Sequence, residues 1–197
     1  MKQILRPASV TNWSERIHGF IWQLFFSSGF KRFGKNIRFV APDIIKGEQA
    51  ISIGNNVYMG RRGWLQVLDH NADAYMNIGD DTYIGRHVHI VCHDAIDIEA
   101  EVLIADKVYI SDNSHDYRDI NLSIRFAPVK PLKPVSIGRG SWLGENVCVI
   151  GASVGKHSVI GSNSVVLNDI PNYCIAVVTP AKIVKRYSES SGKWESC

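Results

Sequence analysis

The stretch "IGDDTYIGRHVHI", residues 78–90, holds two consecutive six-residue units that share one pattern. Each unit begins with isoleucine and glycine, and a small or β-branched residue stands four places after the isoleucine. A helix repeats every 3.6 residues and a strand every 2, so neither element alone gives a period of six. A short strand followed by a turn does give this period, with the glycine allowing the backbone to turn a corner.

The same period runs through most of the chain. The apolar residues spaced by six are Ile53, Met59 and Leu65; Ile78, Ile84, Ile90 and Ile96; Ile98, Ile104 and Ile110; Ile137, Leu143 and Val149; and Val154, Ile160 and Val166. Three such units close one triangular coil, and stacked coils bury columns of Ile, Val and Leu. We therefore predict an all-β fold, a parallel β-helix, over residues 51–170. No proline lies between residues 43 and 127, which suits parallel ladders.

The repeats carry a resemblance to a known family. The units "IGNNVY", "IGDDTY", "IGRHVH" and "IADKVY" resemble those of the left-handed β-helix acyltransferases, and "SDNSHDY", "SWLGENV", "IGSNSVVLNDIP" and "PAKIVK" resemble segments of bacterial sugar and polysaccharide O-acetyltransferases. The resemblance covers roughly residues 35–186. It implies acetyl transfer from acetyl-CoA to a sugar hydroxyl in surface polysaccharide or lipopolysaccharide biosynthesis. It also implies a homotrimer with sites between subunits and no metal.

The two ends of the chain are expected to differ from the β-helix. Residues 1–50 are predicted to form a helical capping segment, with an amphipathic helix over residues 11–28 whose apolar face holds Trp13, Ile17, Ile21, Leu24 and Phe25. This helix has two interpretations: it covers the open edge of the first coil, or it lies on the inner face of a membrane near a lipid-linked acceptor. Residues 171–197 are predicted to form a short helix over "PAKIVKRY" and a polar tail.

The repeat stops at "ISDNSHDYR", residues 110–118, and residues 116–134 are predicted to be a protruding loop. His115 ends a repeat unit at that point. Acetyl transfer to a hydroxyl needs a base, and histidine titrates near neutral pH. The resemblance places the catalytic base at His115; the alternative is an ordinary surface residue at a strand end. Asp112, Glu145 or a backbone carbonyl could hold the second ring nitrogen.

The resemblance also assigns substrate contacts. Trp142 is expected to line the cleft for donor and acceptor, and Gly144 and Ser162 the pantetheine channel, with a backbone N–H near Gly144 for the oxyanion. Lys182 and Lys185 are expected to pair with the phosphates of coenzyme A. The acceptor is assigned to His87, Tyr117 and Trp142. Two positions depart from the family pattern: Asn168 replaces a lysine, and "VTPAK" replaces "GNPAK".

Composition excludes several other classes. The formal charge of +3 comes without a concentrated basic stripe, which argues against nucleic acid binding. Cys92, Cys148, Cys174 and Cys197 have no paired spacing, which indicates a reducing compartment. The apolar stretch over residues 17–26 is too short to span a bilayer and no signal-peptidase site follows it. We therefore expect a cytoplasmic protein.

Three alternative functions stay open. An N-acetyltransferase of an amino sugar, or a small-molecule acetyltransferase, would use the same scaffold. A zinc enzyme like the γ-class carbonic anhydrases would use His87, His89 and His93, but these are spaced H-x-H and H-x3-H rather than H-x4-H. A non-catalytic β-helix scaffold would lack coenzyme A affinity.

Overall fold

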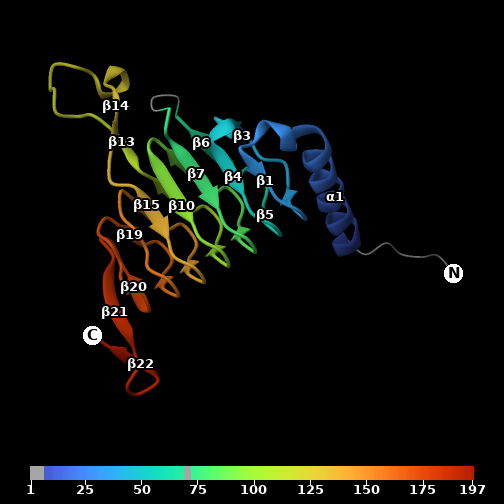
Figure 1. Cartoon of the computed structure of the whole chain (residues 1–197). Helices are drawn as coiled ribbons and strands as arrows, with labels where there is room; N and C mark the ends of the chain where they lie inside the picture. Colours follow the sequence, from blue (N-terminus) through green and yellow to red (C-terminus); the bar gives the residue numbers. More distant parts are fainter. Residues whose placement is uncertain (1–6, 69–71) are drawn as a thin grey trace.

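The computed structural model describes residues 7–68 and 72–197, with side chains from Trp13 onward. Three parallel sheets wrap around one apolar interior to form a triangular solenoid (Figure 1). The chain passes from the first sheet to the second and the third before it rises to the next coil. The parallel β-helix that the repeat predicts, with the left hand that the resemblance implies, is confirmed.

The strands of each sheet come from successive coils. The first sheet contains β1 (Arg32–Phe33), β4 (Ile51–Ile53), β7 (Tyr75–Ile78), β10 (Ala95–Ile98) and β15 (Val135–Ile137). The second contains β2 (Arg38–Phe39), β5 (Tyr58–Met59), β8 (Tyr83–Ile84), β11 (Leu103–Ile104), β16 (Trp142–Leu143), β18 (Val159–Ile160), β20 (Cys174–Val177), β21 (Lys182–Ser188) and β22 (Lys193–Ser196). The third contains β3 (Ile44–Lys46), β6 (Trp64–Val67), β9 (His89–Cys92), β12 (Tyr109–Ser111), β17 (Cys148–Ile150) and β19 (Val165–Val166).

The six-residue period sets the interior. Ile84, Ile90 and Ile104 are completely buried, and so are the other members of their columns up to Val166. Parallel pairing keeps the columns in register, since Ile98 pairs with both Ile78 and Ile137. The small residues four places on, such as Thr82, are also buried.

The corner glycines are needed because successive coils come close together. A Cβ atom on Gly85 would lie 2.7 Å from the carbonyl carbon of Ala105 in the next coil, closer than real Cβ contacts allow. The left-handed backbone conformation falls two residues later, at His87 (φ 56°) and Lys107 (φ 60°). The glycine therefore provides space and the third turn residue takes up the strained conformation.

The N-terminal helix lies across the end of the solenoid (Figure 1). α1 (Pro7–Ile21) continues into a π-helical turn, η1 (Trp22–Phe26), and a short 3-10 turn, η2 (Ser27–Gly29). Gly19 packs against the first coil, because a Cβ there would lie 2.8 Å from the carbonyl oxygen of Ile37. The first coil, β1 to β3, lies within the segment predicted as a cap, since its sequence departs from the repeat. Further 3-10 turns are η3 (Glu48–Ala50) and η4 (Ile124–Phe126).

The predicted C-terminal helix is wrong. Residues 182–188 form β21, which pairs antiparallel with β20, and the polar tail forms β22 against β21. The exposed edge of β20 offers unpaired backbone groups, and a returning strand satisfies them where a helix would not. β-branched Ile183 and Val184 favour the extended conformation.

Candidate active site

His115 stands at the base of a hairpin that projects from the solenoid (Figure 1). β13 (Asn113–His115) pairs antiparallel with β14 (Val129–Pro131), and His115 lies opposite Val129. The N–H of Asp116 donates to the carbonyl of Pro128 at 3.0 Å, which extends the ladder by one residue. The imidazole is exposed. The interruption over residues 116–134 is thus largely one hairpin, and its rigid base holds the histidine.

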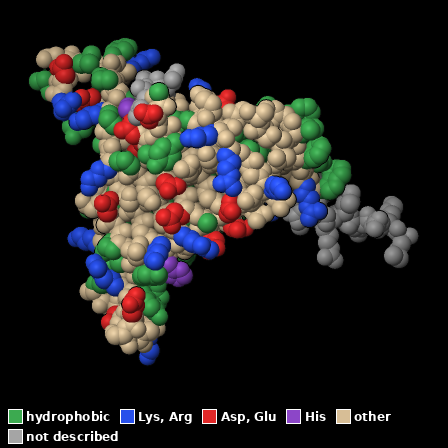
Figure 2. Space-filling model, viewed as in Figure 1, with side chains coloured by type: hydrophobic (Ala, Val, Ile, Leu, Met, Phe, Trp, Pro, Cys, Tyr) green, Lys and Arg blue, Asp and Glu red, His purple; other side chains and the backbone are tan. Residues whose placement is uncertain are grey.

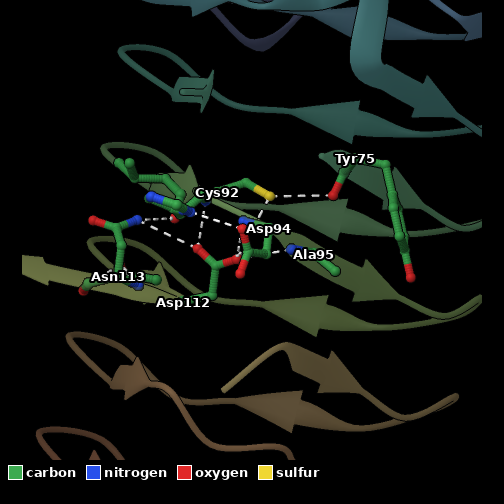
Figure 3. Close-up of polar contacts among 9 residues, drawn as sticks. Tyr75, Cys92, Asp94, Ala95, Asp112 and Asn113 are labelled. Atoms are coloured by element: carbon green, nitrogen blue, oxygen red, sulfur yellow. Dashed lines mark hydrogen bonds and ion pairs between the residues drawn. The ribbon is translucent and has the colours of Figure 1, made fainter. Parts of the chain in front are cut away.

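Asp112 anchors this hairpin to the coil below (Figure 3). Its carboxylate is completely buried and accepts hydrogen bonds from the backbone N–H groups of His93 at 2.6 Å and of Asp94 and Ala95 at 2.8 Å each. The side-chain amide of Asn113 donates to the same carboxylate at 3.3 Å and to the carbonyl of Val91 at 3.0 Å. The Asp112 carboxylate therefore fixes the backbone of the turn at residues 93–95. It makes no hydrogen bond with His115, so the predicted role as partner of the imidazole is not what the structure gives.

Two further side chains beside Asp112 are also structural. Burial and the Asp112 carboxylate raise the pKa of the Cys92 thiol, which keeps it protonated and unreactive. The Nδ1 atom of His93 lies 2.8 Å from the Asp94 carboxylate. Neither group reaches solvent freely, so neither competes with His115 as a reactive group.

The residues assigned to coenzyme A lie along the outer face of the second sheet. Trp142 pairs with Val159, Val159 with Ile175, and Ile175 with Lys185, so these residues form one column across four strands. At about 4.8 Å per strand, the column runs about 14 Å from Trp142 to Lys185. Trp142 is half exposed, which confirms that the indole points outward.

A β-bulge keeps both lysines on that face. Residues three apart on a regular strand point to opposite sides. The register of β21 shifts between Ile175 and Ala176, so Lys182 pairs with Val177 while Lys185 pairs with Ile175. Val177 and Ile175 are two residues apart and share the outer face. The two lysines therefore lie together although the predicted helix is absent.

Gly144 and Ser162 meet at the corner between the second and third sheets. A Cβ on Gly144 would lie 2.7 Å from the backbone nitrogen of Ser162 and 2.9 Å from its Oγ. The N–H of Gly144 already donates to the carbonyl of Ile160 at 2.8 Å. Gly144 itself therefore cannot supply the N–H for the oxyanion.

The backbone N–H of the next residue, Glu145, can donate to the oxyanion instead. At the equivalent corner two coils earlier, the N–H of Arg86 donates to the side chain of Asp106 in the next coil at 2.8 Å. Ser162 occupies the place of that aspartate beside Glu145, and no hydrogen bond is recorded for the N–H of Glu145 within residues 7–68 and 72–197. The sequence signal for this free donor was Ser162, which stands where Asp106 stands relative to Arg86.

The remaining predicted residues lie apart. His87 is exposed in the turn before β9, two coils from Glu145 on the same corner. His89 lies in β9 and stacks on Trp64 at 4.2 Å between ring centroids, so His87 and His89 do not lie on one strand. Glu145 pairs with Lys107 at 3.0 Å rather than with His115.

Tyr117 lies on the hairpin beside an ion pair. Its side chain is 73% exposed. Next to it, Arg118 binds the carboxylate of Asp116 through Nε at 2.8 Å, and this hydrogen bond holds the pKa of Asp116 well below its usual range. The sequence reading missed this pair, which fixes the first turn of the hairpin beyond His115.

Within one chain, the predicted site residues therefore lie at two different corners of the solenoid. His115 and Tyr117 project where the third sheet leads back to the first. Trp142, Gly144 and Ser162 lie on the second sheet and the corner after it. The resemblance placed these residues in one site between subunits, and the fold separates them within a chain.

No group of three or more His, Cys, Asp or Glu side chains lies close enough to hold a metal ion in the part of the chain that the structure describes. All four cysteines are free thiols. Over the same residues, no helix has the length and apolar character required to cross a bilayer.

This fold is that of the hexapeptide-repeat acyltransferases. The chain is 33% identical over 171 residues to WbbJ of Escherichia coli (strain K12), provisionally named a lipopolysaccharide biosynthesis O-acetyl transferase, and the match covers 83% of this chain and 86% of WbbJ. It is 37% identical over 138 residues to a provisionally named acetyltransferase of Mycobacterium tuberculosis, where the match covers 68% of this chain and 45% of the relative. No family model matches the sequence. The chain belongs to the hexapeptide-repeat acetyltransferases.

Solved structures share the fold. AntD, an N-acyltransferase from Bacillus cereus in complex with dTDP and 3-hydroxybutyryl-CoA, matches with a TM-score of 0.70 at 19% identity, over 83% of this chain and 87% of AntD. The hexapeptide-repeat acetyltransferase VCA0836 from Vibrio cholerae, complexed with acetyl coenzyme A, matches with a TM-score of 0.54 at 22% identity, over 95% of this chain and 81% of that one.

Proposed function

We propose that this protein transfers an acetyl group from acetyl-CoA to a sugar hydroxyl in the synthesis of a bacterial surface polysaccharide or lipopolysaccharide. The observation that carries the proposal is the exposed imidazole of His115 on a rigid hairpin base. The relationship to WbbJ supports a sugar acceptor and an O-acetyl product.

The reaction needs few groups. The acceptor hydroxyl attacks the thioester carbonyl while an imidazole nitrogen of His115 takes its proton. The N–H of Glu145 donates to the oxyanion that develops on the carbonyl. The carbon–sulfur bond then breaks, and the imidazolium returns the proton to the leaving thiolate. Donor and acceptor are both present, so no acyl-cysteine forms.

The separation of the two groups of residues supports a homotrimer. His115 of one chain would complete a site with the second-sheet face of a neighbour, where Trp142 borders the cleft. Lys182 and Lys185 would then receive the phosphates at the far end of coenzyme A. Cyclic closure is the common solution when one face of a chain binds a different face of the next.

The test is a comparison of surface glycans from cells with and without the gene. A loss of one acetyl group per repeating unit, measured by mass spectrometry, would support the proposal. Release of the group by mild alkali would identify an ester. An alkali-stable acetyl group would instead favour N-acetylation, as the structural likeness to AntD allows. Unchanged glycans would contradict the proposal.

A further inference from the structure

Apart from Trp22, the large apolar side chains from Trp13 to Phe26 are exposed rather than packed on the solenoid. The helix contacts the first coils through Gly19, through Trp22, whose ring centroid lies 5.9 Å from that of Phe39, and through Glu15, which accepts a hydrogen bond from the Tyr58 hydroxyl at 3.3 Å. The outward residues, here called the apolar ridge, are Trp13, Ile17, Phe20, Ile21, Leu24, Phe25 and Phe26, each between 39% and 68% exposed. Capping the coil therefore does not use this ridge.

Such a ridge is unusual for a surface that faces water. Single exposed apolar residues are common, but contiguous apolar patches mark surfaces that bind something. Figure 2 shows hydrophobic side chains gathered at this end of the molecule, with Lys and Arg side chains beside them. The sequence pattern predicted the apolar face, and the structure shows that the face is left open.

Positive charge is concentrated beside the ridge. Residues 13–40 contain Arg16, Lys31, Arg32, Lys35 and Arg38 against the single acid Glu15, a net charge of 5 − 1 = +4. The whole chain carries +3, so the rest carries 3 − 4 = −1. The small total charge therefore hides a basic segment, with the carboxylates of Asp43 and Glu48 on its far side, in the groove beside Phe25 and Phe26.

Most of these cations have no close acidic partner in the protein, although Arg32 lies near enough to Asp80 to help lower the pKa of that carboxyl. Elsewhere, Arg86 pairs with Asp106 and Arg139 with Glu101. None of the ion pairs recorded among the described residues includes a Lys or Arg between positions 13 and 40. The basic segment is thus complementary to an external anionic surface.

A groove beside the ridge places arginines where a phosphate could bind. Arg16 and Arg38 line a cavity of about 480 Å³ between α1 and β2, together with Phe20, Gln23 and Asn36. The Arg38 guanidinium lies 5.7 Å from the centroid of the Tyr58 ring, which orients it. Guanidinium groups bind phosphate oxygens through paired N–H donors, and Phe20 offers an apolar surface next to them.

We infer that this end of the protein docks on an anionic phospholipid surface. The apolar ridge enters the boundary between headgroups and acyl chains, as amphipathic interfacial helices do. The Arg16–Arg38 groove receives a lipid phosphate, and the neighbouring cations add attraction to the negatively charged leaflet. A second copy of the chain fits this surface poorly, because a symmetric contact would place one +4 end against another.

Flotation with vesicles tests the inference. The full-length protein should float with vesicles of phosphatidylcholine mixed with phosphatidylglycerol and stay behind with phosphatidylcholine alone. The triple variant Phe20→Asn, Leu24→Asn, Phe25→Asn should bind the anionic vesicles roughly a hundredfold more weakly, because it loses the apolar burial. The Arg16→Gln, Arg38→Gln variant should lose roughly fivefold per charge.

The matched control changes three exposed apolar residues of the hairpin: Ile120→Asn, Leu122→Asn, Phe126→Asn. This variant should float like the parent protein. Excess inorganic phosphate should not displace the parent, which separates lipid binding from binding of free phosphate. Failure of the parent to float, or equal flotation of the Phe20, Leu24 and Phe25 triple variant with an unchanged thermal midpoint, would overturn the inference. A smaller oligomer for that variant without vesicles would also overturn it, by showing a protein contact.

Discussion

The position of His115 is set by backbone hydrogen bonds rather than by its own side chain. β13 and β14 hold the residue, and Asp112 holds the base of both to the coil below. Replacing the imidazole should therefore leave the fold intact. This separation makes the chemical role of His115 testable without a folding defect.

We expect His115→Ala to lower turnover by roughly a hundred- to ten-thousand-fold, because a positioned base contributes about that much. Its thermal midpoint and its affinity for acetyl-CoA should match the parent, as measured by calorimetry and titration. His157→Asn is the control, since His157 is also exposed but lies in a turn with φ 51°, which asparagine tolerates. Near-parental turnover of His115→Ala would make the histidine a structural residue.

Asp112→Asn, in contrast to His115→Ala, should lower the stability of the fold. An amide cannot accept hydrogen bonds at both positions, so at least one of the three backbone N–H donors at His93, Asp94 and Ala95 would lose its partner. We expect a loss of about 1–3 kcal/mol in the free energy of unfolding, measured by denaturant titration. An unfolding free energy equal to that of the parent would contradict the anchoring role.

At the scale of elements, the repeat made most of the solenoid predictable. Each isoleucine in the column of Ile84 marks one strand. The six-residue pattern can be recognised from neighbouring residues in the sequence, without knowledge of contacts between distant residues. Three features depended on tertiary contacts and were missed or misread. The C-terminal strands form because the edge of β20 is open, the loop forms a hairpin because β13 and β14 pair, and α1 packs through Gly19 rather than through its apolar face.

The sequence could indicate which residues are candidates for the site, but not how they lie relative to one another. The resemblance identified Trp142 and Lys185, and the register of the second sheet is what aligns them. The free N–H of Glu145 depends on which side chain the next coil presents, and that follows from stacking. Asp112 was one of three alternatives for the partner of the imidazole, and the sequence does not show that its carboxylate is buried against the backbone of His93, Asp94 and Ala95.

The bulge in β21 leads to a prediction about coenzyme A. Because Lys182 and Lys185 share one face, Lys182→Ala, Lys185→Ala should raise the KM for acetyl-CoA more than it lowers kcat, through loss of ground-state binding. Lys193→Ala, on the neighbouring strand β22, should change neither constant. Steady-state kinetics at saturating acceptor measures both. An unchanged KM in the double variant would place the phosphates elsewhere.

At the scale of the whole molecule, the fold keeps His115 and the face of the second sheet at different corners of one chain. If the proposed function is right, a complete site requires two chains, with a solenoid face of each in contact with the next. We expect light scattering to show a trimer, and the activity to disappear on dilution below the concentration at which trimers form. A stable monomer with full activity would contradict this arrangement.

Mixing two defective variants gives the sharpest test of a shared site. His115→Ala lacks the base, and Lys182→Ala, Lys185→Ala turns over slowly when acetyl-CoA is kept far below its raised KM. If each site takes the histidine from one chain and the donor face from its neighbour, randomly mixed trimers should contain both intact parts at roughly a quarter of their sites. Co-expression of the two variants should therefore restore activity above that of either variant alone. If the histidine and the donor face of one chain formed the site, every site in the mixture would carry one of the two defects, and no activity would return.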